Sequence, residues 1–172
     1  MPEPIDRVFL KCAADKLRQL AGRIGDCLGR LSEEQVWTRG GDNENAIGNI
    51  VLHLCGNVRQ WIGSGLGGRP DVRVRDREFA ARGEVKPEEL RERLMSTVDD
   101  AVAILGDLPA GRLTEVVRVQ SYDVTVLEAV FHVVEHFSQH TGQILFATKQ
   151  LTGADLGYYR HLSRAAHDEK TP

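Results

Sequence analysis

The amino-acid sequence predicts an all-α protein folded as a four-helix bundle. Four segments of about 20 to 27 residues repeat their apolar residues with the 3.6-residue period of an amphipathic helix. Charged or glycine-rich stretches separate them. The connection between the second and third segments has about 22 residues, which is long enough to cross a bundle from end to end. These two helices can therefore run parallel, whereas short loops would make neighbouring helices antiparallel.

The first half of the chain contains two of the predicted helices. We expect the first over about residues 4–28, and a short helical turn after Ser32, where SEEQ is a capping-box pattern. The second covers about residues 44–64 and ends at the breaker GSGLGGRP. We interpret the charged stretch PDVRVRDREFAARGEV, residues 70–85, as an irregular connection.

The second half begins with a helix at Pro87, because proline is favoured in the first helical turn and Glu88 and Glu89 suit its dipole. This helix extends to about Leu105. RLTEVVRVQSYDVTV, residues 112–126, contains a β-like run and predicts a short extended arm or small hairpin. The fourth helix covers about residues 125–151. We expect one short docking helix in the tail.

The length of 172 residues suits one domain, residues 1–172, with a core of about 5–152 and a tail of 153–172. A formal charge of −3 gives no electrostatic footprint for nucleic acid or a membrane surface. No apolar run matches a bilayer span, and the N-terminus lacks a signal-peptide pattern. The three cysteines form no CxxC pair and are expected to be reduced. We therefore expect a cytoplasmic protein.

Three of the six histidines, His132, His136 and His140, are spaced four residues apart on the predicted fourth helix. On a helical wheel, His136 and His140 lie near the apolar stripe and His132 lies towards its edge. Histidines one turn apart can bind one ion, whereas His132 and His140 are about 12 Å apart along the axis. His136 and His140 are therefore the predicted metal ligands of this helix. His132 is expected at a solvated edge or beside the ligands.

The third predicted ligand is His53, which interrupts the apolar stretch NIVLHLCGNVRQWI. Three imidazoles leave a coordination position open on a divalent ion, for which zinc and nickel are the expected metals. Histidine ligands need partners for their other ring nitrogen, and Asn57 and Gln143 are the predicted ones. No carboxylate is expected at this site, because Glu135 faces away from it and Glu128 aligns with His132. Ordinary buried or exposed histidines remain the alternative explanation.

The segments NAIGNIVLHLCGNVRQWI and VTVLEAVFHVVEHFSQHTGQILFATKQL resemble the DinB/YfiT-like superfamily of metal-dependent bundle proteins. The similarity covers about residues 5–152, and its specific parts are the mid-helix histidine after IGN and the H-x-x-x-H-T-G-Q pattern. It implies an up-down-down-up bundle, a metal held by His53, His136 and His140, and a homodimer. Known relatives include thiol-dependent transferases and isomerases that use bacillithiol, mycothiol or glutathione.

Three functions follow as hypotheses. The first is a metal-dependent enzyme that transfers a low-molecular-weight thiol, its cosubstrate, to a small electrophilic substrate. The second is a metal- or ligand-binding bundle without turnover, for example in a stress response. The third is metal-assisted hydrolysis, which ranks last because no base is identified. The sequence assigns no catalytic residue.

Overall fold

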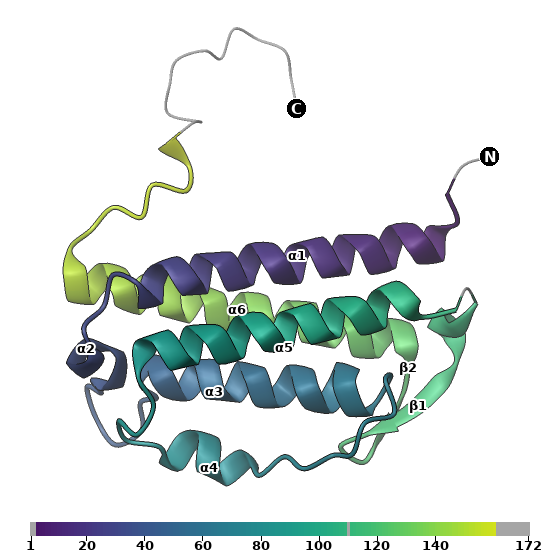
Figure 1. The fold of residues 1–172 in the computed structure, drawn as a ribbon, viewed down its shortest axis with the longest axis horizontal. Coiled ribbons are helices and arrows are strands. Elements are labelled where there is room, and N and C mark those ends of the chain that lie inside the picture. The colour runs from purple at the N-terminus through teal and green to yellow at the C-terminus, as the bar shows by residue number, and fades with distance from the viewer. Residues whose placement is uncertain (1–2, 110, 161–172) are drawn as a thin grey trace, which may run out of the picture.

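Four long helices lie side by side in the computed structural model, which describes residues 3–109 and 111–160 (Figure 1). They are α1 (Ile5–Leu28), α3 (Ile47–Val58), α5 (Pro87–Asp107) and α6 (Val126–Thr152). Helices α1 and α3 each pack against both α5 and α6. Leu17, Leu54, Leu94 and Phe137 come from the four helices and are fully buried in one shared core. The prediction of a mostly helical fold is confirmed.

The predicted helix boundaries follow the local capping signals. The short turn predicted after Ser32 is α2 (Glu33–Trp37), and Ser32 and Gln35 form its capping box. Helix α6 begins with a second capping box, in which Thr125 Oγ1 accepts from the backbone N–H of Glu128 and the Glu128 side chain accepts from the backbone N–H of Thr125. Each box satisfies backbone donors that the first helical turn leaves free.

The second predicted helix is interrupted near its end. Helix α3 passes directly into a π-helical turn, η1 (Arg59–Ser64). A π-turn rotates the residues that follow it relative to the preceding helix. Trp61 in this turn is buried, and its ring centroid lies 4.2 Å from that of His132 on α6.

The connection after η1 contains a helix that sequence analysis missed. Helix α4 (Arg75–Ala80) packs on α3, and its segment returns along α3 to the start of α5 (Figure 1). The buried Asn49 amide donates to the carbonyl oxygens of Glu78, at 2.8 Å, and Ala81, at 3.0 Å. The prediction of an irregular connection was wrong here, because these tertiary hydrogen bonds hold a segment that has no apolar stripe of its own.

A small hairpin precedes α6, as the β-like run predicted. Strands β1 (Val116–Val119) and β2 (Tyr122–Thr125) are antiparallel, and the 3₁₀ turn η2 (Arg112–Thr114) leads into them. Gln120 and Ser121 form the turn with φ angles of 51° and 70°. Of the tail predicted to hold a docking helix, the structure describes residues 153–160, which form no α-helix, and the rest of the tail lies outside the described residues. Within the described part of the chain, no helix is long and apolar enough to cross a lipid bilayer.

Candidate metal centre

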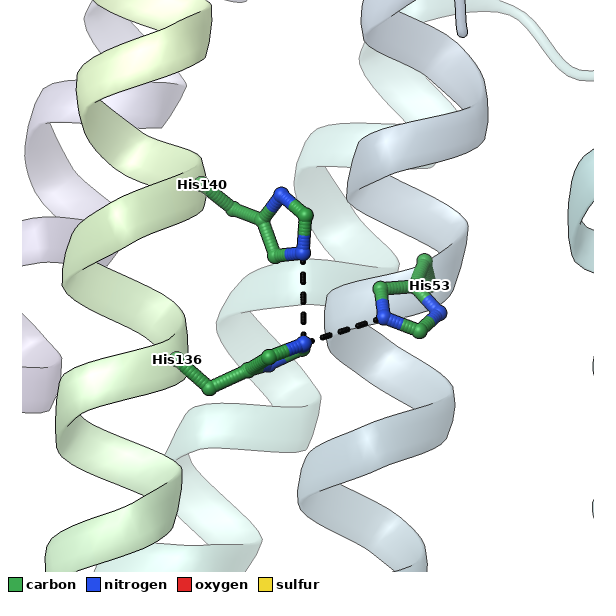
Figure 2. Close-up of side chains that lie close together, drawn as sticks. All are labelled: His53, His136 and His140. Atoms are coloured by element: carbon green, nitrogen blue, oxygen red, sulfur yellow. Dashed lines mark hydrogen bonds between the residues drawn. The ribbon is translucent and has the colours of Figure 1, made fainter.

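Three imidazole rings converge between α3 and α6. His53 projects from α3, and His136 and His140 project from successive turns of α6 (Figure 2). The Nε2 atom of His136 lies 3.1 Å from Nε2 of His53 and 3.2 Å from Nε2 of His140. Each residue offers one ligand atom within 4.8 Å of the other two. We call His53, His136 and His140 the three-histidine cluster.

The packing of α6 places two of these histidines. Val133, Phe137 and Ile144 are fully buried, and His136 and His140 lie beside this buried stripe, on the side towards α3. Both are half-buried, while His53 is buried with 7% of its surface exposed. The cluster thus lies at the seam between two helices, partly shielded from water.

Two of the three rings, those of His53 and His140, are oriented by a hydrogen bond at Nδ1, the nitrogen that points away from the centre of the cluster. Glu78 Oε2 lies 3.0 Å from His53 Nδ1, and Gln143 Oε1 lies 2.7 Å from His140 Nδ1. Because a carboxylate and an amide oxygen are acceptors, these contacts favour the tautomer with the proton on Nδ1 and a lone pair on Nε2. Arg73 Nη2 also lies 3.1 Å from His53 Nδ1, but its hydrogen bond to Glu78 Oε2 is shorter, at 2.8 Å. Both lone pairs are therefore available in the centre of the cluster.

His136 is the central ring of the cluster. Its Nε2 faces both of the other Nε2 atoms, and its buried Nδ1 has no hydrogen-bond partner among the described residues. Burial, and then the neighbouring His140 and His53, lower the pKa of His136 to about 3. Burial also lowers the pKa of His140, although Gln143 opposes this shift. These two rings are thus neutral at physiological pH, which is the form that binds metals.

The expectation that no carboxylate lies at the site was wrong, because Glu78 from α4 contacts the cluster. Burial alone would raise the pKa of Glu78, but hydrogen bonds from Arg73 and then from His53 outweigh it and lower that pKa. Arg73 Nε donates to Glu78 Oε1 at 2.7 Å, and Arg73 Nη2 donates to Oε2 at 2.8 Å. The Arg73 side chain is itself only 6% exposed. Glu78 is therefore an ionised, doubly bound carboxylate that orients His53.

The sequence offered one signal for this contact. Gly56 lies one turn after His53, and the Glu78 carboxylate occupies the space where a Cβ atom at position 56 would lie. A glycine inside an apolar helix can indicate the close approach of another group. The signal does not identify that group, because Glu78 is 25 residues from His53 and reaches it only through the fold of the connection.

Of the other residues predicted around the cluster, His132 lies beside a ligand, which is one of its two expected positions, whereas Asn57 makes no hydrogen bond to the cluster. Asn57 is buried, but its Oδ1 has no hydrogen-bond partner among the described residues. The His132 ring stacks near His136, with centroids 5.6 Å apart, and packs against Trp61. Burial lowers the pKa of His132. Neither residue makes a hydrogen bond to the cluster, whereas Gln143 makes one.

The geometry fits a divalent ion. With Zn–N bonds of about 2.0–2.1 Å, the nitrogens of a tetrahedral site are about 3.3 Å apart. The measured separations of 3.1 and 3.2 Å are close to this value. The Nε2 atoms of His53 and His140 both present lone pairs, and the neutral His136 ring has at most one proton at Nε2 to share between them. A cation between them would resolve this, and three ligands would leave a further position open.

Comparisons with known proteins agree with this architecture. A family model described as "Protein of unknown function (DUF1572)" matches residues 4–165. A conserved protein from Enterococcus faecalis has a similar structure, with a TM-score of 0.69, 13% identity, and coverage of 84% of this chain and 97% of that one. A DinB-like protein, YjoA, from Bacillus subtilis has a TM-score of 0.65, 14% identity, and coverage of 86% and 96%. No curated protein matches the sequence.

Proposed function

The chain belongs to the DUF1572 family of the DinB-like superfamily, and from this premise we propose that it is a metal-dependent enzyme that transfers a low-molecular-weight thiol to a small electrophile. The observation that carries the proposal is the convergence of three Nε2 atoms at one point, with separations of 3.1 and 3.2 Å. When bound, the ion would supply Lewis acidity at its open position and lower the pKa of a thiol there.

The chain's own residues have distinct roles in this proposal. His53, His136 and His140 would hold the ion. Glu78 and Gln143 keep the Nε2 lone pairs of His53 and His140 directed at it, since each accepts from the corresponding Nδ1. Arg73 holds Glu78 ionised and limits its motion. Zinc and nickel both suit three imidazoles, and either is compatible with the site.

The environment of Glu78 bears on the choice between thiol transfer and hydrolysis. A hydrolase of this kind would need a base to activate water, as the glutamate of a metalloprotease does. Among the described residues, Glu78 is the one carboxylate hydrogen-bonded to the cluster, and both of its oxygens bind Arg73 or His53. A thiol whose pKa is lowered by a metal needs no such base. We therefore prefer thiol transfer to hydrolysis.

The first experiment measures the metal content of untagged protein purified without added metal, using mass spectrometry. We expect about one ion per chain, lost in His53→Ala and in His136→Ala because two imidazoles hold a late first-row ion far less firmly. His132→Ala is the matched control, since it removes a histidine from the same helix outside the cluster. It should keep the ion.

Activity is then measured with thiols and an electrophile such as a chloro-aromatic compound. Thiol-dependent loss of the electrophile that disappears in His136→Ala would support the transferase. Metal binding without any turnover would instead favour the second function, a non-catalytic metal- or ligand-binding bundle. A wild-type protein that stays empty after zinc and nickel are offered at neutral pH would contradict the metal site itself.

Two further features are part of the same proposal. We propose the up-down-down-up order of the bundle, which is supported by the connection that returns along α3 before α5 begins (Figure 1). We also propose a homodimer that acts on a small-molecule substrate in the cytoplasm.

A further inference from the structure

A cavity lies along α3, next to the Arg73–Glu78 pair that contacts His53. It has a volume of about 710 Å³ and lies between α3, η1, α4 and the loop at residues 69–74, with Arg93 of α5 at its edge. None of the cluster histidines lines it. The volume is within the range of pockets that bind small organic molecules.

Arginines outnumber carboxylates in the lining of this cavity. Its lining includes five arginines and three carboxylates. Arg73 is paired with Glu78, while Arg69 and Arg93 pair with Asp100 and Glu89, which are outside the lining. Arg59 and Arg77 have no ion pair and no side-chain hydrogen bond among the described residues. These two guanidinium groups are free to bind an anion. The other two carboxylates of the lining are already bound: Asp71 accepts from Gln60, and Glu84 accepts from the backbone N–H of Arg82.

The remaining wall is largely apolar. Leu52, Val72, Val74, Ala80 and Val85 contribute to it. Val72 and Val74 are 84% and 51% exposed, an unusual position for two large apolar side chains on a short loop. Cys55 also lines the cavity, but burial raises its pKa to about 11, so its thiol is not a nucleophile there. The site therefore has the character of a binding pocket.

Hydrogen bonds hold the loop over the cavity. Gln60 of η1 donates to Asp71 at 2.7 Å and accepts from Arg73 Nη1 at 2.9 Å. Arg69 pairs with Asp100 of α5 at 2.8 Å. The cavity is thus already formed without a ligand, as small-molecule pockets commonly are.

We propose that this cavity binds a small organic anion, with a carboxylate or phosphate group on an apolar body. The anionic group contacts Arg59 and Arg77, and the apolar body packs against the valines and Leu52. Guanidinium groups suit this task because they offer planar, paired donors to both kinds of anion. The pocket is separate from the metal centre. The side chains of Arg73 and Glu78 form the wall between the two.

Calorimetric titration with phenyl phosphate tests the proposal, with benzyl alcohol and inorganic phosphate as probes that lack the charge or the apolar body. Phenyl phosphate should bind more tightly than either. In the double variant Arg59→Gln, Arg77→Gln the affinity should fall at least about tenfold, because two charge-assisted contacts are lost. The matched control is Arg18→Gln, Arg30→Gln, which removes two arginines outside the cavity and should bind as the wild type does.

The metal centre is excluded as the anion site by repeating the titration in His136→Ala, where binding should persist. Circular dichroism verifies that each variant is folded. If the double variant is not folded, the single variant Arg77→Gln replaces it in the titration. Binding that disappears in His136→Ala would place the anion on the metal and overturn the proposal. So would equal affinity in the two double variants, or no binding up to about 10 mM phenyl phosphate. None of these outcomes depends on whether the metal is catalytic.

Discussion

At the scale of single residues, the orientation of His53 in the three-histidine cluster depends on a carboxylate that is not itself one of the proposed ligands. Glu78 accepts from His53 Nδ1 at 3.0 Å and from Arg73 through both oxygens. A carboxylate at this position fixes the tautomer of a histidine ligand and increases its basicity. The pairing with Arg73 keeps Glu78 charged in spite of its burial. The arrangement is therefore expected to strengthen metal binding.

Glu78→Gln tests this role. The amide still accepts from His53 but no longer carries the negative charge, so we expect zinc affinity to fall about tenfold or more. Competition with a chromophoric chelator measures it. Asp76→Asn removes a carboxylate from the exposed face of the same helix and should leave the affinity unchanged. Equal affinities in Glu78→Gln and the wild type would show that Glu78 does not act on the metal.

At the scale of elements, one asparagine determines where the α4 segment lies. Asn49 is fully buried, and besides its two bonds to the α4 segment its Oδ1 accepts from Arg39 Nη2 at 2.7 Å and from the N–H of Ala46 at 3.2 Å. Every polar atom of this side chain is thus used. The asparagine of the IGN motif connects the start of α3 to the segment that supplies Glu78.

Asn49→Leu is expected to lower the free energy of unfolding by about 3 kcal/mol, since buried backbone carbonyls and Arg39 lose their partners. Urea denaturation measures this loss. Hydrogen exchange should also become faster in residues 75–81, because the segment is no longer held to α3. Asn43→Leu, in an exposed turn, is the control. Unchanged exchange in residues 75–81 would contradict the role assigned to Asn49.

At the scale of the whole molecule, α6 presents exposed apolar residues away from its histidines. Leu127, Phe131 and Phe146 are 41%, 59% and 66% exposed. Phe131 lies roughly 140° and 180° around the helix from His136 and His140, and Phe146 lies roughly 80° and 120° from them. Leu127 and Phe131 are one turn apart, and Phe146 lies about 22 Å further along the helix. Exposed aromatic side chains are enriched at interaction surfaces. This face can therefore be covered by a second chain without obstructing the metal centre.

If the predicted homodimer uses this face, the double variant Phe131→Asp, Phe146→Asp should be monomeric, because a buried, unpaired carboxylate opposes association. Size-exclusion chromatography with light scattering determines the mass. Val72→Asp, Val74→Asp is the matched control, since it charges two exposed apolar residues elsewhere. A wild-type monomer would exclude the homodimer, and a variant that remains dimeric would place the interface on another face.

The sequence by itself determined the four long helices and the residues of the cluster. Both depend on local patterns: a 3.6-residue apolar period, a capping box at Ser32, two histidines one turn apart, and a histidine that interrupts an apolar helix. The contact between His140 and Gln143 could be predicted for the same reason, since residues three apart on a helix are neighbours.

Only the tertiary structure decided the surroundings of His53 and the cavity between α3 and α4. Glu78, Arg73 and Asn49 are brought together by a connection with no periodic pattern, and the hydrogen bonds that hold it join residues 25 to 32 positions apart. Likewise, Arg59 and Arg77 share a cavity because α4 returns along α3. Local sequence patterns record which face of an element is buried, whereas contacts between elements depend on the path of the whole chain.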